Sequence, residues 1–157
     1  NCVKPDINDL GIIGQLVPNV DTDSCNGCKK CQVAVACPMK AVSVEDGEIE
    51  INEEVCNNCG RCVGTCPFDV IEEGTPGFKI TIGGRWGKKT ATAQPLNYLF
   101  TTEEEVLDMV EKVICFFRDE GISGERFADT VSRIGFEKAQ QMLLSDDILL
   151  RKDEILK

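Results

Sequence analysis

Residues 25–66 read CNGCKKCQVAVACPMKAVSVEDGEIEINEEVCNNCGRCVGTC and hold eight of the chain's ten cysteines. The cysteines form two runs, and each run has the spacing C-x2-C-x2-C, then a gap, then a Cys-Pro pair. The gap is five residues in the first run and three in the second. The two runs therefore indicate an internal duplication, with an insertion of two residues in its first half.

The gap of three residues is the spacing of bacterial ferredoxins, in which the fourth cysteine of each run ligates the other of two clusters. Three thiolates at this spacing lie on one loop around a corner of a cubane, so the fourth ligand must come from the other run. The proline after that ligand fixes the direction of the chain. We therefore expect two [4Fe–4S] clusters, the first on Cys25, Cys28, Cys31 and Cys66 and the second on Cys37, Cys56, Cys59 and Cys62.

Two other interpretations of the cysteines fit less well. A structural zinc site usually pairs C-x2–4-C with a second, distant pair of ligands, and the third cysteine of each run is surplus to such a site. A disulfide framework is typical of small secreted domains, whereas this sequence shows no secretory segment. Soft thiolate ligands suit iron–sulfur clusters.

The composition narrows the classes of function. The 157 residues carry a net charge of −10, which argues against nucleic acid as a partner because such binding depends on basic surface. The chain has no histidine, so imidazole ligands, a histidine base and a Rieske centre are excluded. No apolar run is long enough to cross a membrane. A cysteine-rich chain without a signal peptide predicts a reducing, cytoplasmic location.

Apolar alternation predicts several short strands. Strands are expected over residues 12–17 and 78–82, and a further one over residues 68–71, after the second cysteine run. A hairpin is expected where residues 41–44 and 48–51 flank Asp46-Gly47, because that dipeptide favours a tight turn. Residues 75–77 are expected to lead out of the cysteine-rich module.

Helices are expected in the last third of the chain. The clearest covers residues 102–120, where Thr102 and Glu105 match a capping box and Gly121 ends the helix. Its inward side chains are predicted from their helical spacing to be Val106, Val110, Val113, Ile114 and Phe117. Two more helices are expected, from residue 123 or 124 to 134 and over 136–144, with a peripheral tail. Cys115 is expected to be a core thiol.

A basic loop, GGRWGKK, follows the strand predicted at residues 78–82. Its Gly-Gly pair allows a ligand to approach the backbone closely. Arg85, Lys88 and Lys89 are suited to pairing with carboxylates or an oxyanion. On spacing alone, an exposed basic turn is the better interpretation.

The segments around the cysteines resemble the C-terminal part of siroheme-dependent nitrite and sulfite reductases of the ferredoxin-bearing, anaerobic or dissimilatory type. The resemblance rests on NCVKPDINDLGIIG at residues 1–14, FKITIGGRWGKK at 78–89 and GERFADTVSRIGF at 124–136. It implies an α+β fold, with a two-cluster bacterial-type ferredoxin module inserted into part of an α/β siroheme-reductase domain that ends in helices. The implied parts are an N-terminal strand segment at 1–20, the ferredoxin module at 21–74 and the remainder of the siroheme-type domain at 75–157.

The resemblance also implies cofactors beyond the two clusters. The family binds a siroheme-coupled [4Fe–4S] cluster through C-x5-C and C-x3-C pairs, and Cys2 matches one of these four cysteines. The other three, and the family's sulfite-gripping Arg and Lys residues, have no match in this chain. Siroheme and the third cluster are therefore expected only in the complete protein, with Arg85, Lys88 and Lys89 as candidate contacts to siroheme carboxylates. No catalytic residue is expected in this chain.

These observations predict the electron-transfer portion of a siroheme sulfite or nitrite reductase, an oxidoreductase, relaying single electrons through two [4Fe–4S] clusters. The expected partners are an electron-donor protein and the rest of the reductase or a homologous subunit, with neither nucleic acid nor membrane. A stand-alone two-cluster ferredoxin and a relay subunit of another oxidoreductase remain alternatives. A plain carrier is less favoured because it does not need so long a chain after its second cysteine run.

Overall fold

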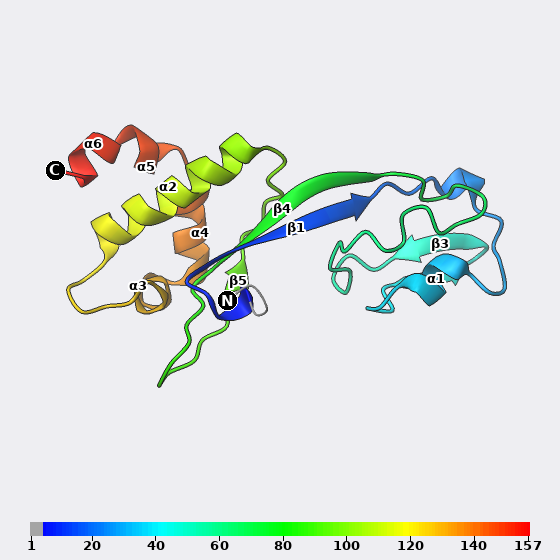
Figure 1. The fold of residues 1–157 in the computed structure, drawn as a ribbon, viewed down its shortest axis with the longest axis horizontal. Helices are drawn as coiled ribbons and strands as arrows, with labels where there is room; N and C mark the ends of the chain where they lie inside the picture. The colour runs from blue at the N-terminus through cyan, green and yellow to red at the C-terminus, as the bar shows by residue number, and fades with distance from the viewer. Residues whose placement is uncertain (1–4) are drawn as a thin grey trace. The chain divides into compact units, whose positions relative to one another are not determined.

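The computed structural model describes residues 5–157, and the chain divides into two units (Figure 1). Unit 1 contains the residues up to Ile13 together with Phe78–Lys157, and unit 2 is the continuous segment Gly14–Gly77. Unit 2 therefore interrupts the sequence of unit 1 and holds both cysteine runs. Within residues 5–157, no helix is long and apolar enough to span a bilayer.

Unit 2 is built on the predicted hairpin. Strand β2 (Val42–Glu45) pairs antiparallel with β3 (Glu48–Ile51). Asp46 and Gly47 both have positive φ, at 51° and 91°, as a type I′ turn requires. The hairpin prediction is thus confirmed. A 3-10 turn, η2 (Thr22–Ser24), and a short helix, α1 (Gln32–Ala36), complete the regular structure of this unit.

A small core fills unit 2. Its buried members come from α1, from the hairpin and from the second cysteine run: Val33, Ile49, Cys62, Val70 and Ile71. The strand predicted over residues 68–71 is absent, and this segment forms turns. Asp69 has φ at 55°, a left-handed conformation that interrupts an extended chain. Val70 and Ile71 are apolar because they fill the core and not because they lie in a sheet.

Two strands are each shared between the units. β1 (Leu10–Pro18) and β4 (Gly74–Ile82) are neighbours in a three-stranded sheet, with β5 (Gln94–Pro95) on the other side of β4. β4 begins four residues earlier than predicted, so residues 75–77 lie in the strand instead of leading away from it. A proline at position 76 is compatible with a strand where its missing N–H is not needed in the ladder.

Unit 1 holds the other helices. A 3-10 turn, η1 (Pro5–Ile7), precedes β1. The helices follow β5 in the order α2 (Glu103–Glu120), α3 (Phe127–Ile134), α4 (Phe136–Leu144), α5 (Asp147–Leu150) and α6 (Lys152–Ile155). Ile148 of α5 is 2% exposed and belongs to the core of this unit. The tail is therefore not peripheral as predicted.

Helix α2 begins and ends where the sequence indicates, but its buried face is rotated from the predicted one. Thr102 and Glu105 form the capping box. The buried side chains include Met109, Val113, Cys115 and Phe116, whereas Ile114 is 61% exposed and Phe117 is 37% exposed. Cys115 is a core thiol, as expected.

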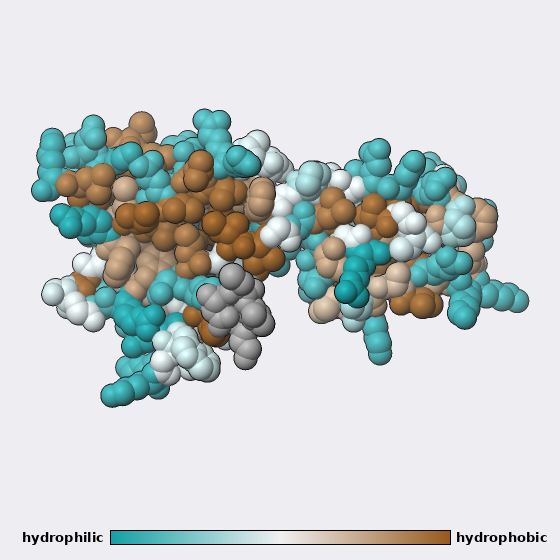
Figure 2. All heavy atoms as spheres, in the orientation of Figure 1, coloured by the Kyte–Doolittle hydropathy of each residue, from teal (hydrophilic) through white to brown (hydrophobic). Residues whose placement is uncertain are grey.

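The exposed apolar side chains of α2 line a groove on the surface of unit 1. Ile114 and Phe117 line an open groove of about 540 Å³ together with Leu10, Val110 and Phe127. Figure 2 shows apolar surface over this helix. Helix α2 thus has apolar side chains on two adjoining stripes, and helical spacing alone does not distinguish the covered stripe from the open one.

Helix α3 begins at Phe127, a few residues later than predicted. Asp129 accepts a hydrogen bond from the backbone N–H of Arg126 at 3.4 Å, which satisfies a free donor at the start of the helix. Gly135 has φ at 92° and separates α3 from α4, a conformation that glycine adopts without steric cost.

Candidate functional site

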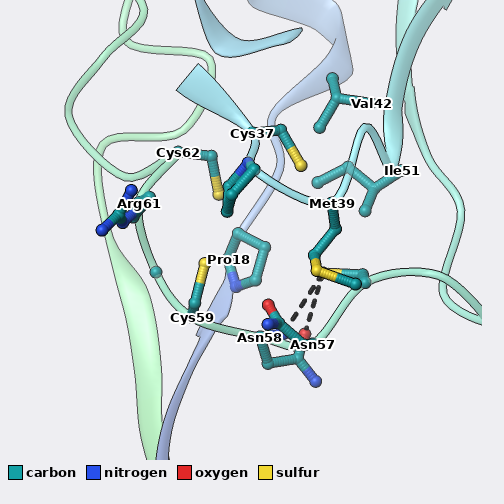
Figure 3. A pocket seen from close by; sticks show the side chains of 13 residues that line it. Pro18, Cys37, Met39, Val42, Ile51, Asn57, Asn58, Cys59, Arg61 and Cys62 are labelled. Atoms are coloured by element: carbon teal, nitrogen blue, oxygen red, sulfur yellow. Dashed lines mark hydrogen bonds between the residues drawn. The ribbon is translucent and has the colours of Figure 1, made fainter. Parts of the chain in front are cut away.

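The eight cysteines of the two runs surround two separate cavities in unit 2. One cavity is lined by Cys25, Cys28, Cys31 and Cys66, and we name it the first cysteine site. The other is lined by Cys37, Cys56, Cys59 and Cys62, and we name it the second cysteine site (Figure 3). Each site thus combines three thiols from one run with the last cysteine of the other run. This is the grouping that the crossed ligand arrangement requires.

The duplication in the sequence is repeated in the backbone. The second residue after the first cysteine of each run has a left-handed conformation, with φ at 59° for Gly27 and 52° for Asn58. The third residue after the last cysteine of each run does the same, with φ at 54° for Lys40 and 55° for Asp69. The two runs therefore share these two left-handed turns despite the two-residue insertion before Cys37.

Backbone hydrogen bonds hold these loops in equivalent ways. Lys40 N–H donates to the carbonyl of Cys37 at 3.3 Å, and Asp69 N–H donates to the carbonyl of Cys66 at 3.3 Å. Each bond closes a turn over the Cys-Pro pair. The proline supplies the fixed φ that begins such a turn, and the last cysteine of each run lines the cavity of the other run.

Each cysteine loop packs against a different support. A Cβ atom placed on Gly27 would lie 2.8 Å from the carbonyl oxygen of Gly47, so the first loop lies against the hairpin turn. A Cβ atom on Gly60 would lie 2.7 Å from side-chain atoms of Leu16, so the second loop lies against β1. Glycine is required at both positions, because the φ is positive and there is no room for a side chain.

Two thiols of the second cysteine site accept backbone hydrogen bonds. Ala41 N–H donates to Cys37 Sγ at 3.3 Å, and Asn58 N–H donates to Cys56 Sγ at 3.4 Å. Such bonds stabilise the thiolate form and tune a cluster held by it. Burial acts in the opposite sense at Cys62, where it raises the pKa of the thiol.

The donor set fits an iron–sulfur cluster better than a single ion. Within residues 5–157, no group of three or more thiols and carboxylates is arranged to hold one metal ion. A tetrahedral zinc site would need its sulfurs only about 3.8 Å apart, from a Zn–S bond of about 2.3 Å. The first cysteine site instead surrounds a cavity of about 210 Å³.

The second cysteine site is narrower, with a cavity of about 20 Å³. Pro18, Met39 and Asn58 are among the side chains around it (Figure 3). Met39 is 43% exposed, and its unbranched side chain is adaptable. A cluster at this site therefore requires side chains around the cavity to move, and Met39 is an exposed and adaptable one.

Three of the four residues considered for siroheme lie in the described part of unit 1. Cys2 lies outside the described residues. Arg85 Nη1 donates to both carboxylate oxygens of Asp129 at 2.6 Å, and Arg85 Nε is buried without a hydrogen-bond partner. Lys88 and Lys89 are exposed in the loop that follows. The guanidinium of Arg85 is therefore already paired with a carboxylate of this chain, that of Asp129.

Two residues that hold this basic loop, Arg126 and Asp129, were not identified from the sequence. Arg126 Nη1 donates to the carbonyl of Trp86 at 3.0 Å, and Arg126 Nη2 lies 3.4 Å from Asp9 Oδ2. Asp129 pairs with Arg85, as described above. The sequence pattern around these two residues is the Arg-x-x-Asp spacing of the α3 cap, which indicates the start of a helix. It does not predict a contact with residues some forty positions earlier in the chain.

Comparison with known proteins gives one family and several relatives. Residues 1–147 match the family described as "Nitrite and sulphite reductase 4Fe-4S domain". The chain is 29% identical over 139 residues to a coenzyme F420-dependent sulfite reductase of Methanocaldococcus jannaschii, covering 87% of this chain and 22% of that protein. It is 29% identical over 111 residues to the alpha subunit of a dissimilatory-type sulfite reductase of Allochromatium vinosum, covering 66% of this chain and 27% of that subunit.

A solved structure is similar in fold. The crystal structure of dissimilatory sulfite reductase I matches with a TM-score of 0.56 at 21% identity, covering 88% of this chain and 38% of that one. The mixed α and β fold is therefore shared with that protein. The chain spans only about a quarter of the length of the two curated relatives.

Proposed function

The chain belongs to the nitrite and sulphite reductase 4Fe–4S domain family, and on this premise we propose that it is the electron-transfer part of a siroheme-dependent sulfite or nitrite reductase. Unit 2 would hold two [4Fe–4S] clusters, and unit 1 would contribute to the siroheme-type domain into which unit 2 is inserted. The boundaries of the inserted module would then be those of unit 2, residues 14–77.

The observation that carries this proposal is the grouping of eight thiols into two sets of four. Cys66 lines the first cysteine site although it belongs to the second run, and Cys37 lines the second site although it belongs to the first run. A carrier of a single cluster needs one such set. Two sets on one small core supply two adjacent one-electron sites, which suits a relay.

The chain's own residues would have three tasks. The eight thiolates would bind the clusters, which exchange single electrons when bound. The Val33, Ile49, Val70 and Ile71 side chains would keep water from the inner faces of the sites. Backbone N–H groups of Ala41 and Asn58 would stabilise the charge on Cys37 and Cys56.

Unit 1 would contact the siroheme of the complete reductase. Lys88 and Lys89 are exposed on the loop after β4 and would pair with siroheme carboxylates. Arg85 would support that loop through Asp129. Cys2 would be one of four ligands of the siroheme-coupled cluster, and the sulfite- or nitrite-binding residues would lie in other parts of the reductase. The partners would be that remainder of the reductase and an electron-donor protein, in a reducing cytoplasm.

The test is anaerobic purification of the native protein with an antibody against this chain. The proposal expects siroheme absorption bands that shift when sulfite or nitrite is added, together with an iron–sulfur spectrum. The chain of 157 residues, produced alone with its clusters, should take up electrons from a viologen without reducing sulfite. Sulfite turnover by that chain alone, or a native protein with iron–sulfur absorption but no siroheme, would contradict the proposal.

A further inference from the structure

We propose that the two cysteine sites work in a fixed order, with electrons received at the first cysteine site and delivered to unit 1 from the second. This inference rests on the proposed function. It concerns a property that the cysteine spacing does not reveal, because each run supplies three cysteines to one site and its last cysteine to the other. It is argued from the different attachment of the two sites to the rest of the chain.

The second cysteine site is bonded to the strand by which the chain passes from unit 1 into unit 2. Leu16 N–H donates to the carbonyl of Asn58 at 2.9 Å, and Gln15 Nε2 donates to the carbonyl of Asn57 at 3.2 Å. Leu16 also forms a parallel β-bridge with Cys59. Ile13, only three residues before Leu16, already belongs to unit 1.

The strand by which the chain returns to unit 1 lies at the same place. A Cβ atom on Gly74, the first residue of β4, would lie 2.7 Å from Leu16 Cγ. Pro18 of β1 lines the second cavity beside Cys59 and Cys62 (Figure 3). Both connections of unit 2 therefore run past the second cysteine site.

Among the described residues, none of β1 or β4 lines the first cysteine site. Its cavity is lined by six residues of the first run, four at the end of the second run and two of the hairpin: Cys25, Asn26, Cys28, Lys30, Cys31, Gln32, Cys66, Pro67, Phe68, Val70, Val44 and Ile49. Electron transfer weakens more steeply across gaps than along covalent and hydrogen bonds. The continuous route from Cys59 through Asn58 and Leu16 to Ile13 therefore favours the second site as the point of delivery.

The electron balance of this order is simple. A reduced iron–sulfur or flavin protein would lose one electron, which the first site gains. The second site would then gain that electron and restore the first to its oxidised form. The siroheme-coupled cluster of the complete reductase would be the acceptor, so each cycle moves one electron without a proton or a bond change in unit 2.

The chain offers a matched pair of residues for testing this order. Lys30 directly precedes Cys31, and Arg61 occupies the same place before Cys62. Both are exposed, and each is the one charged residue that lines its cavity among the described residues. Lys30→Glu and Arg61→Glu thus make the same change of charge beside different sites.

The experiment measures the rate at which a small, acidic, reduced ferredoxin transfers an electron to the cluster-loaded protein, followed by the difference between the iron–sulfur absorbance changes of the two proteins. At low ionic strength we expect Lys30→Glu to lower the second-order rate constant roughly three- to tenfold, because the reversed charge repels the acidic donor more strongly at the first site. Arg61→Glu should lower it less than about twofold, and high salt should remove the difference. An equal effect of the two variants, no effect of either, or a larger effect of Arg61→Glu would overturn the order.

A second readout does not depend on electron transfer. A zero-length carbodiimide would join carboxylates of the same ferredoxin to nearby lysines, and peptide mass spectrometry would locate the links. The order predicts links at Lys29 and Lys30 in preference to Lys40, which follows Cys37 of the second site and is also exposed. Links mainly at Lys40 would contradict it. An unmodified protein that shows no iron–sulfur spectrum after cluster loading would instead mark failure of the proposed function.

Discussion

Arg85 donates to both carboxylate oxygens of Asp129, at 2.6 Å each, and so joins the loop after β4 to the first turn of α3. The side chain of Arg85 is only 19% exposed, and its Nε is buried without a partner. The pair therefore neutralises a charge that water reaches poorly. It also positions the loop that bears Lys88 and Lys89.

Replacing Asp129 with Asn should destabilise unit 1 by about 1–3 kcal/mol, because a poorly solvated guanidinium is left without its counter-charge. Urea unfolding followed by helical circular dichroism measures the change. Asp9→Asn is the matched control, since Asp9 pairs with Arg126 at 3.4 Å between side chains that are both nearly half exposed. It should cost less than about 1 kcal/mol, and an equal cost for the two variants would contradict the role given to Asp129.

Replacing Gly27 with Ala should reduce the stability of unit 2 and its iron content. The new Cβ would have both a left-handed backbone and a contact of 2.8 Å with the Gly47 carbonyl, which cannot rotate away. Gly64→Ala is the control, because Gly64 has φ at 69° but nothing within 4 Å of its Cβ position. The control isolates the backbone strain, about 1 kcal/mol. Similar iron loss in both variants would show that the contact with Gly47 is unimportant.

The crossed grouping of the cysteines predicts a pattern of iron loss in paired variants. Cys66→Ser should remove about half of the iron, because each four-cysteine set is expected to hold one of two clusters. Adding Cys28→Ser should remove little more, since both residues line the first site, whereas adding Cys59→Ser should remove nearly all of it. Iron and sulfide analysis measures this, and the reverse pattern would mean uncrossed sites. Cys115→Ala, in the core of unit 1, should leave the iron unchanged.

We expect the stability of helix α2 to depend on pH through the ionisation of Glu105. Hydrogen bonds from Tyr98 and from the N–H groups of Thr101 and Thr102 lower the pKa of Glu105 from 4.5 to about 2. Because the folded-state pKa lies below the unfolded value, this stabilisation is complete above pH 4.5 and is lost as pH falls towards 2.

The test compares unfolding midpoints of the native chain and Glu105→Gln between pH 6 and pH 2.5, using the helical signal. The difference should be largest above pH 5 and should shrink as pH falls. Acid also weakens thiolate ligation, but it does so in both proteins and therefore cancels in the difference. If the difference between the two unfolding midpoints does not vary with pH, the negative charge of Glu105 does not contribute to the stability of α2.

Local patterns in the sequence predicted the elements whose causes are local. The Asp46-Gly47 turn, the Thr102–Glu105 cap and the stop at Gly121 each depend on a few adjacent residues, and all three are present. The strand expected at 68–71 failed because its apolar residues, Val70 and Ile71, fill the core from a turn. Apolar residues in a sequence indicate which positions are buried, but they do not specify the conformation of the backbone there.

The sequence by itself determined the cysteine-rich loops, because their form follows from ligand spacing, glycine and proline. Tertiary structure decided which stripe of α2 is covered, that Arg85 is paired with Asp129, and that the second cysteine site lies against β1. Those contacts join residues far apart in the chain, such as Leu16 and Asn58. Their formation depends on how whole elements pack, and no local pattern encodes it.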